Sequence, residues 1–344
     1  MLSVLLPTLL LNLFSFFNLL GIKNELVFNQ VVYLGIALIM FFIARKIGIF
    51  FFKNNAKFFY WFFIFLLTIT YLIGDVIRGS RRWIDFYIFN FQPSEFFKIF
   101  FIIFFAHYFT KYRKELDDPK RFLKTLMYFL LPAFLIFRQP DLGSALVYVV
   151  IFFSMLLFSH TPKRYIFYIL TFCLIAIPLS WFFLHGYQKD RIISFINPES
   201  NQRGTSYNMI QAIVTAGSGQ FLGKGLGFGT QSKLFFLPEN HTDFAYASLV
   251  EQFGFIGGAI VVVLYIYVIF FLIRRMFYFL RSKDEENLFL SYFLVGTFAF
   301  FTFQVLVNIG MNVGLLPIVG IALPFISYGG SSLVSLFFLF GLIP

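Results

Sequence analysis

Three side chains capable of acid–base or metal chemistry lie close together in the run PENHTDF, residues 238–244. Glu239, His241 and Asp243 alternate along it, so an extended run would point all three the same way. Asp243 precedes a long apolar stretch, and the N-terminus of a helix stabilises an ionised carboxylate. We therefore expect Asp243 to be a general base, with a simple helix cap as the alternative role. Glu239 and Asp243 would also suit a divalent cation such as Mg²⁺ or Mn²⁺.

A glycine-rich run, GSGQFLGKGLGFGT at residues 217–230, lies shortly before this motif. It does not match the phosphate-binding loop GxxxxGK[ST], because Gly225 follows Lys224 where Ser or Thr is required. Its glycines can still expose backbone N–H groups to a diphosphate, with Lys224 as a point charge. A tightly turned loop that binds nothing is the other interpretation.

Charged residues also occur in apolar stretches, where charges are costly and usually mark function. Glu95 and Lys98 stand three residues apart, so they would share one face of a helix. Asp141 opens another apolar stretch, and Glu251 lies within the stretch that follows Asp243. The Glu95–Lys98 pair either supports the reaction or joins helices structurally.

The chain that carries these residues is unusually apolar. Of its 344 residues, 59% are hydrophobic and 12% are charged, against roughly 25% charged in a soluble domain. Apolar runs of about 20 residues, long enough to cross a membrane as a helix, recur from end to end. We predict an all-α polytopic membrane protein, with residues 1–344 as a single domain. The net charge of +11 is too sparsely distributed for a nucleic-acid-binding protein.

About ten transmembrane helices are expected. They span approximately residues 2–21, 27–52, 57–77, 93–111, 122–137, 141–160, 164–185, 243–273, 287–309 and 314–343. Lys and Arg then collect at one side, which by the positive-inside rule is the cytoplasmic side and holds both chain ends. Residues 186–242 become a long extracellular loop between helices seven and eight. Pro317 and Pro324 predict that the last helix is broken and lines a cavity.

These motifs together resemble the SEDS family of bacterial cell-wall polymerases, the RodA, FtsW and SpoVE group, and RodA somewhat more than FtsW. The resemblance covers most of the chain. It rests on six runs in the family's order: QPSEFFK (92–98), RQPDLGSAL (138–146), RIISFINPE (191–199), SYNMIQAIVTAGSGQFLGKGLGFGTQ (206–231), FLPENHTDFAYASLVEQFGFIGG (236–258) and NIGMNVGLLPIVGIALPFISYGGSS (308–332).

The resemblance implies a peptidoglycan glycosyltransferase that polymerises lipid II, for cell elongation, at the outer face of the bacterial cytoplasmic membrane. It implies a class B penicillin-binding protein as the transpeptidase partner. It also maps the family's catalytic aspartate to Asp243 and its intramembrane pair to Glu95 and Lys98.

The other expected site residues fall into two groups. Substrate or diphosphate binding is expected of Arg191, Arg203, Gln211, Gly223, Lys224, Gly225 and His241. Cavity lining is expected of Asp141, Glu251, Ser331 and Ser332. A divalent cation near Glu239 and Asp243 is the one cofactor considered.

Three alternatives are open at this point. A lipid II flippase needs a charged pathway through both leaflets, but the candidate charges all fall in the outer half under the predicted topology, which favours polymerisation. A scaffold for a transpeptidase would need neither Asp243 nor Lys224. A polymerase of the division or sporulation pathway would use the same chemistry.

Overall fold

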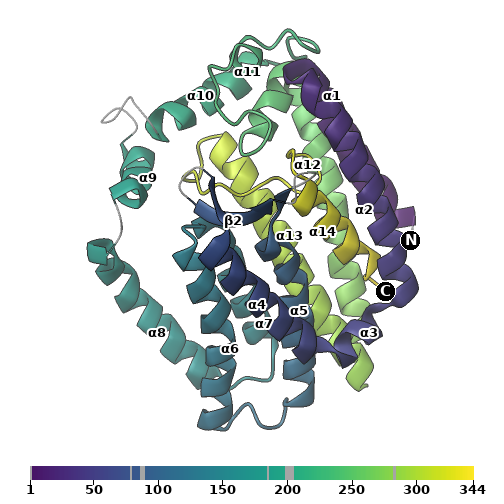
Figure 1. The fold of residues 1–344 in the computed structure, drawn as a ribbon, viewed down its shortest axis with the longest axis vertical. Helices are drawn as coiled ribbons and strands as arrows, with labels where there is room; N and C mark the ends of the chain where they lie inside the picture. Colours follow the sequence, from purple (N-terminus) through teal and green to yellow (C-terminus); the bar gives the residue numbers. More distant parts are fainter. Residues whose placement is uncertain (1, 78–79, 86–89, 184–185, 198–204, 282–283) are drawn as a thin grey trace. The chain divides into compact units, whose positions relative to one another are not determined.

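The computed structural model describes residues 2–77, 80–85, 90–183, 186–197, 205–281 and 284–344, and they are mostly helical (Figure 1). Five helices in this described part are long and apolar enough to cross a membrane: α1 Leu2–Ile22, α2 Val27–Ile47, α4 Ala56–Ile73, α12 Ala245–Leu280 and α13 Glu285–Asn312. Two shorter apolar helices are α7 Leu142–Phe158 and α14 Gly330–Gly341. The chain is therefore a multi-pass membrane protein, and the count of ten spans stays a prediction.

The remaining helices modify several of the expected boundaries. They are α3 Ile49–Asn54, α5 Pro93–Lys111, α6 Pro119–Arg138, α8 Lys163–Ser180, α9 Gly186–Ile196, α10 Thr205–Ser218 and α11 Thr230–Lys233, with short 3-10 helices η1 Asn24–Leu26 and η2 Trp181–Phe183. The helix expected over 27–52 is divided at Gly48. The stretch 186–242 contains α9, α10 and α11, and residues 313–329 form the predicted break before α14.

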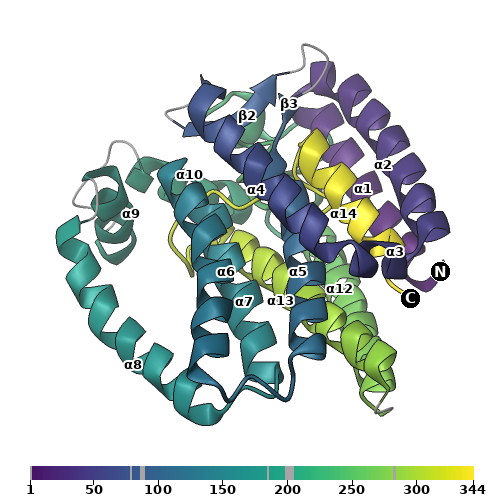
Figure 2. The ribbon, with the colours of Figure 1, turned by 60° about the horizontal axis from the view of Figure 1, so that its bottom comes forward.

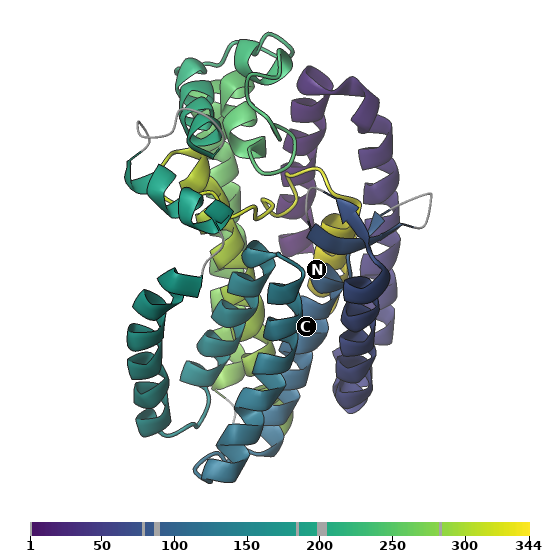
Figure 3. The ribbon, with the colours of Figure 1, turned by 60° about the vertical axis from the view of Figure 1, so that its left-hand side comes forward.

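A small antiparallel sheet joins α4 to α5, and the expectation of an all-α chain missed it. Its strands are β1 Asp75–Ile77, β2 Ser80–Asp85 and β3 Asn90–Phe91, with Trp83 opposite Asp75 and Ile84 opposite Phe91. Figure 3 shows it where α4 ends and α5 begins. The strands are too short for a periodicity to stand out between two long apolar helices.

Contacts divide the chain into two units, each assembled from distant segments. Unit 1 comprises Met1–Val31, Lys163–Val268 and Gln304–Tyr328. Unit 2 comprises Val32–Pro162, Ile269–Phe303 and Gly329–Pro344. Asp243 and the glycine-rich run belong to unit 1, whereas Glu95, Lys98 and Asp141 belong to unit 2.

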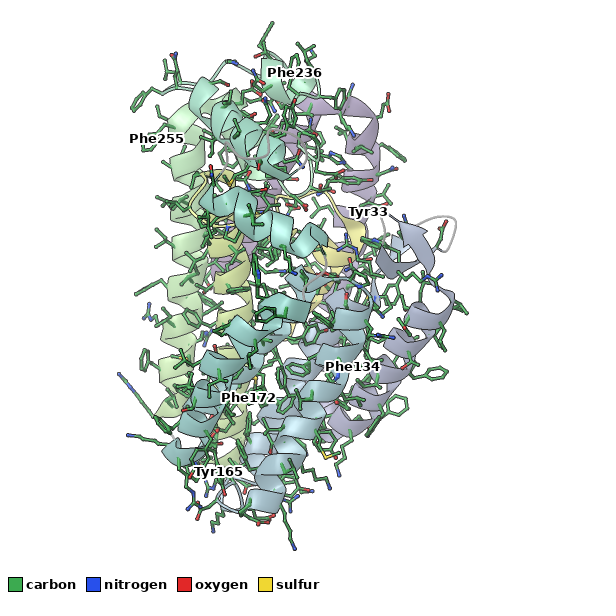
Figure 4. All side chains as sticks on the ribbon, turned by 90° about the vertical axis from the view of Figure 1, so that its left-hand side faces the viewer. Tyr33, Phe134, Tyr165, Phe172, Phe236 and Phe255 are labelled. Atoms are coloured by element: carbon green, nitrogen blue, oxygen red, sulfur yellow. The ribbon has the colours of Figure 1, made fainter. Side chains whose placement is uncertain are left out.

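Unit 2 is built around α5, which is buried along nearly all of its length by α3, α4, α7 and α14 (Figure 2). Much of its core is aromatic, with ring centroids 4.3 Å apart for Tyr60 and Phe104 and 4.2 Å apart for Phe129 and Phe152. Other aromatic side chains of unit 2 are exposed. Phe134 of α6 is 61% exposed (Figure 4).

Unit 1 has a compact apolar cluster beside the start of α12. Ala212, Leu237, Phe244 and Ala247 are buried in it, with Ile318 packed against them. This cluster surrounds the residues that immediately follow Asp243, so the aspartate sits at the border of a rigid core.

Candidate active site

Asp243 lies in a compact turn rather than in an extended run. Glu239 has a positive φ of 52°, and its carbonyl accepts hydrogen bonds from the N–H groups of Thr242 and Phe244, both at 3.1 Å. The run is therefore not extended, so the condition under which Glu239, His241 and Asp243 would point the same way is not met. Thr242 Oγ1 also donates to Glu239 Oε2 at 2.9 Å, which ties the two ends of the turn together.

The main chain just before Asp243 is held by the segment that follows α13. The carbonyl of His241 accepts from the N–H of Tyr328 at 2.8 Å, and the carbonyl of Thr242 accepts from Ser327 Oγ at 2.6 Å. The imidazole of His241 also lies 5.9 Å from the ring of Tyr328, measured between centroids. Residues 241 and 242 are therefore fixed to the break that precedes α14.

The main chain of Asp243 is held by two asparagines of α13. Its carbonyl accepts from Nδ2 of Asn308 and from Nδ2 of Asn312, each at 3.0 Å. Both asparagines are fully buried. A Cβ added at Gly320 would lie 3.6 Å from Asp243 Oδ2, so the carboxylate borders the same broken segment. Three consecutive carbonyls are thus anchored, which fixes the backbone from which the Asp243 carboxylate projects.

The glycine-rich run is inserted into a kink of α12. Gly254 interrupts that helix with φ 68°, and the N–H of Phe255 then donates to the carbonyl of Gln220 at 2.8 Å. In return the N–H of Gly225 donates to the carbonyl of Gln252 at 3.0 Å. A Cβ at Gly223, where φ is 83°, would lie 2.2 Å from the Gln252 oxygen. This geometry favours the tightly turned loop over a cradle of free N–H groups.

Lys224 and Glu251 form an ion pair that fastens this loop. Lys224 Nζ lies 3.1 Å from Glu251 Oε1, and the Glu251 side chain is fully buried. The other carboxylate oxygen accepts from Ser232 through its N–H at 2.9 Å and its Oγ at 2.6 Å. The Lys224 side chain is 28% exposed, and its ammonium also donates to Thr230 Oγ1 at 2.8 Å.

Unit 2 contains the Glu95–Lys98 pair, which was expected to lie within the membrane. Lys98 Nζ lies 2.5 Å from Glu95 Oε1, and the Lys98 side chain is only 1% exposed. The ammonium also lies 5.3 Å from the ring centroid of Phe300. Glu95 Oε2 is buried and has no hydrogen-bond partner among the residues that the structure describes. The predicted one-face arrangement of the pair is confirmed.

Asp141 is the centre of a second polar cluster in unit 2. It is buried, and it accepts hydrogen bonds from the N–H of Ser144 at 3.1 Å and from Gln92 Nε2 at 3.3 Å. Arg82 Nη1 lies 3.5 Å from Asp141 Oδ1. Ser331 Oγ accepts from the N–H of Gln92 at 3.1 Å, so the predicted residues Asp141 and Ser331 contact the same glutamine.

For four further predicted residues, the structure gives at most the element on which each lies. Gln211 lies on α10, and its Oε1 is buried without a hydrogen-bond partner within the described ranges. Arg191 lies on α9, and Ser332 lies on the first turn of α14. Arg203 is outside the described residues. In the described part of the chain, no group of three His, Cys, Asp or Glu side chains is arranged to hold a metal ion.

Several residues of these sites escaped sequence reasoning. Asn308, Asn312 and Ser327 stand in motifs that we interpreted only as parts of a broken helix. Asn308 and Asn312 are four residues apart and therefore share a helix face, but this spacing does not reveal which group they bind. Their partner lies 65 to 69 residues away in the chain, beyond the reach of any local pattern.

Comparison with known proteins agrees with the expected family. A family model for FtsW, RodA and SpoVE, described as "Cell cycle protein", matches residues 2–344. "Peptidoglycan glycosyltransferase MrdB" of Helicobacter pylori is 36% identical over 338 residues, covering 96% of this chain and 85% of the relative. The protein of the same name from Escherichia coli is 33% identical over 346 residues, covering 100% and 91%. "Probable peptidoglycan glycosyltransferase FtsW" of Buchnera aphidicola is 33% identical over 307 residues, covering 89% and 86%.

Solved structures share the fold. A chain from "Structural coordination of polymerization and crosslinking by a peptidoglycan synthase complex" superposes with a TM-score of 0.81 at 24% identity, covering 100% of this chain and 96% of that chain. The crystal structure of Thermus thermophilus rod shape determining protein RodA superposes with a TM-score of 0.71 at 24% identity, covering 100% and 95%. With a family model matching from residue 2 to residue 344, the chain belongs to the FtsW, RodA and SpoVE family.

Proposed function

We propose that this chain is a bacterial peptidoglycan glycosyltransferase that polymerises lipid II, the disaccharide-peptide linked to undecaprenyl diphosphate. The names of relatives that are 33% to 36% identical along most of its length support this activity. The structural observation that carries the proposal is the anchoring of the turn around Asp243. The backbone that carries this acidic side chain is held by hydrogen bonds to three successive carbonyls. Such fixed geometry suits a general base that must be aligned with one hydroxyl of the acceptor.

In the proposed reaction, Asp243 removes the proton from a hydroxyl of the acceptor sugar. The hydroxyl oxygen then forms a bond to the anomeric carbon of the donor, and the bond from that carbon to the diphosphate breaks. A single displacement inverts the anomeric centre. General-base assistance of this kind contributes about 10²–10⁴-fold to the rate.

The departing diphosphate needs positive charge, and unit 1 contains three candidate residues for it. They are Lys224, whose side chain is partly exposed, Arg191 and Arg203. A Mg²⁺ or Mn²⁺ ion bound to the diphosphate would need few protein ligands, because Mg²⁺ keeps several waters and is held by one or two carboxylates. Glu239 and Asp243 fit that donor set. Such an ion would neutralise the charge that develops on the leaving group.

We further propose that the site faces outward from the cytoplasmic membrane and that the chain serves cell elongation. The undecaprenyl tails would lie against exposed apolar helix faces of unit 1, such as the face of α12 that carries Val263. A class B penicillin-binding protein would crosslink the strands. A structure with the same fold comes from a peptidoglycan synthase complex, which is consistent with such a partner. A pull-down that recovers the division transpeptidase instead would contradict the elongation role.

The decisive experiment uses the full chain, purified and reconstituted in vesicles with lipid II, with glycan length measured by gel. Asp243→Asn should abolish polymerisation and leave folding intact, whereas Asp284→Asn, an exposed aspartate in unit 2, should polymerise normally. Retained polymerisation in the Asp243 variant would exclude this base. Movement of lipid II between leaflets without any polymer would show a flippase. Measuring polymerisation with increasing chelator, and then after adding back Mg²⁺ or Mn²⁺, tests whether the reaction requires a divalent cation.

A further inference from the structure

The first turn of α12 has an inserted side chain. In a regular helix the N–H of residue i donates to the carbonyl of residue i−4, so the N–H of Ala247 would donate to the carbonyl of Asp243. Here the N–H of Ala247 donates to Asn312 Oδ1 at 2.9 Å. Nδ2 of the same asparagine donates to the carbonyl of Asp243 at 3.0 Å. The carboxamide of Asn312 therefore bridges two groups that would otherwise bond to each other.

The bridging carboxamide is itself rigidly held. Asn312 is fully buried, and its Nδ2 also donates to the main-chain carbonyl of Asn308 at 2.8 Å. Asn308 in turn donates to the carbonyls of Asp243 at 3.0 Å and Ile321 at 2.7 Å. Each asparagine thus orients the other, and both fix the carbonyl of Asp243.

The bridge decides where the helix starts. The first main-chain bond at this end runs from the N–H of Ser248 to the carbonyl of Phe244, so the helix begins at Ala245. One more helical bond, from residue 247 to residue 243, would start the helix one residue earlier, at Phe244, and would make Asp243 its N-cap. The side chain of an N-cap aspartate accepts a hydrogen bond from an N–H group of the first helical turn. The carboxylate would then be engaged as a helix cap, at the N–H of Ala245 or Tyr246, and would no longer be available as a base.

We propose that Asn312 is a positioning residue for Asp243, which keeps the aspartate on the turn 239–244 and out of the N-cap position of α12. Asn312 touches no substrate in this role; it acts through the main chain of the base. The inference rests on the proposed function, because it concerns catalysis only if Asp243 is the general base. A displacement of about 1 Å at a reacting group lowers the rate by about 10²-fold, so the expected effect is large.

The test compares two substitutions in the reconstituted polymerisation assay. Asn312→Ala removes both bonds and lets the turn close, and kcat should fall about 10²-fold with KM for lipid II within threefold of the wild type. Asn312→Asp keeps the side-chain volume and the acceptor for the N–H of Ala247 but loses the donor to the Asp243 carbonyl. The kcat of this variant should therefore fall by a similar factor. A role in packing alone would leave Asn312→Asp active, and wild-type kcat in that variant would overturn the proposal.

A matched control separates positioning from stability. Asn12 is also buried in unit 1, and its Nδ2 donates to the carbonyl of Thr8 at 3.0 Å, far along the chain from the turn. Asn12→Ala should lower the unfolding temperature without lowering the kcat of the folded fraction. An equal fall of kcat in Asn12→Ala and Asn312→Ala would mean a general loss of structure and would overturn the proposal.

Asp243→Asn in the same assay distinguishes this inference from the proposed function. If Asp243→Asn polymerises normally, the base assignment fails, and the positioning claim fails with it. If Asp243→Asn is inactive while both Asn312 variants keep the wild-type kcat, only the positioning claim fails. Loss of kcat in Asp243→Asn, Asn312→Ala and Asn312→Asp, with Asn12→Ala active, supports both.

Discussion

Lys224 and Glu251 join two parts of unit 1 that are 27 residues apart in the sequence. Their side chains lie 3.1 Å apart, and the main-chain N–H of Lys224 donates to the carbonyl of Glu251 at 2.9 Å. The same residue pair is therefore connected through the backbone and through the side chains. The glycine-rich loop is fastened to α12 at this point, four residues before Phe255 resumes the helix.

The first prediction concerns this pair. Lys224→Met leaves the buried Glu251 carboxylate without its counter-ion, and we expect the free energy of unfolding to fall by about 2–3 kcal/mol, below the full cost of breaking a buried pair because Lys224 is partly exposed. The double variant Lys224→Met with Glu251→Gln should lose less free energy of unfolding than the two single variants lose in sum. Thermal unfolding of the purified variants measures these differences.

Lys233→Met is the matched control for that experiment. Its ammonium donates to the carbonyl of Gly227 at 2.9 Å in the same loop, and the residue is exposed. Its loss should change stability little. If Lys224→Met were as stable as the wild type but slow in polymerisation, Lys224 would act on the diphosphate instead of holding the loop.

A second prediction compares two glycines of the same run. Gly223→Ala combines a positive φ with a clash against the Gln252 carbonyl, so it should destabilise unit 1 by about 1–2 kcal/mol or more. Gly217→Ala meets no atom within 4 Å and lies on α10, so it should be neutral or stabilise by up to about 1 kcal/mol. If both variants lowered the unfolding temperature by similar amounts relative to the wild type, the tight packing of the loop would be contradicted.

A third prediction concerns the buried pair of unit 2. Glu95→Gln leaves the Lys98 charge buried without its partner, which should cost about 3–5 kcal/mol in the free energy of unfolding. Glu95→Gln with Lys98→Met removes both charges and should recover most of that loss, because a neutral pair needs no desolvation of ions. Equal stability of the single and double variants would show that the ion pair is not closely coupled. We expect polymerisation to stay low in the stable double variant, as a functional role of the pair requires.

A fourth prediction tests the membrane orientation. Cys173 is the only cysteine of the chain, so Cys173→Ser provides a background for single new cysteines. In spheroplasts, whose cytoplasmic membrane is intact, a membrane-impermeant maleimide should label Gly217→Cys without permeabilisation. Lys114→Cys should be labelled only after the membrane is opened. The reverse order would place the glycine-rich run in the cytoplasm.

Local sequence patterns were sufficient for the five membrane-length helices and for the break before α14, but not for α9, α10 and α11, which lie in the stretch expected to be a loop. Apolar runs predicted the cores of α1, α2, α4, α12 and α13, because a membrane span needs a minimum apolar length. Pro317 and Pro324 predicted the irregular segment before α14. These features depend on residues a few positions apart.

Features that depend on distant residues were out of reach. The turn at Glu239 was missed because the same alternation of polar residues is compatible with a strand and with a turn in which one residue has a positive φ. The Lys224–Glu251 pair was missed because both residues had separate interpretations, one as a ligand and one as cavity lining. Only the insertion of the loop into the kink at Gly254 brings them together.

The bonds through which α13 and the segment after it anchor residues 241–243 end on main-chain oxygens. A carbonyl oxygen is present whichever amino acid occupies a position, so substitutions at His241 or Thr242 leave these acceptors intact. The side-chain donors Asn308, Asn312 and Ser327 have no such protection, because most single codon changes remove them. The mutational tolerance of the turn is therefore determined on α13 and the segment after it, where loss-of-function mutations should be denser than at positions 241 and 242.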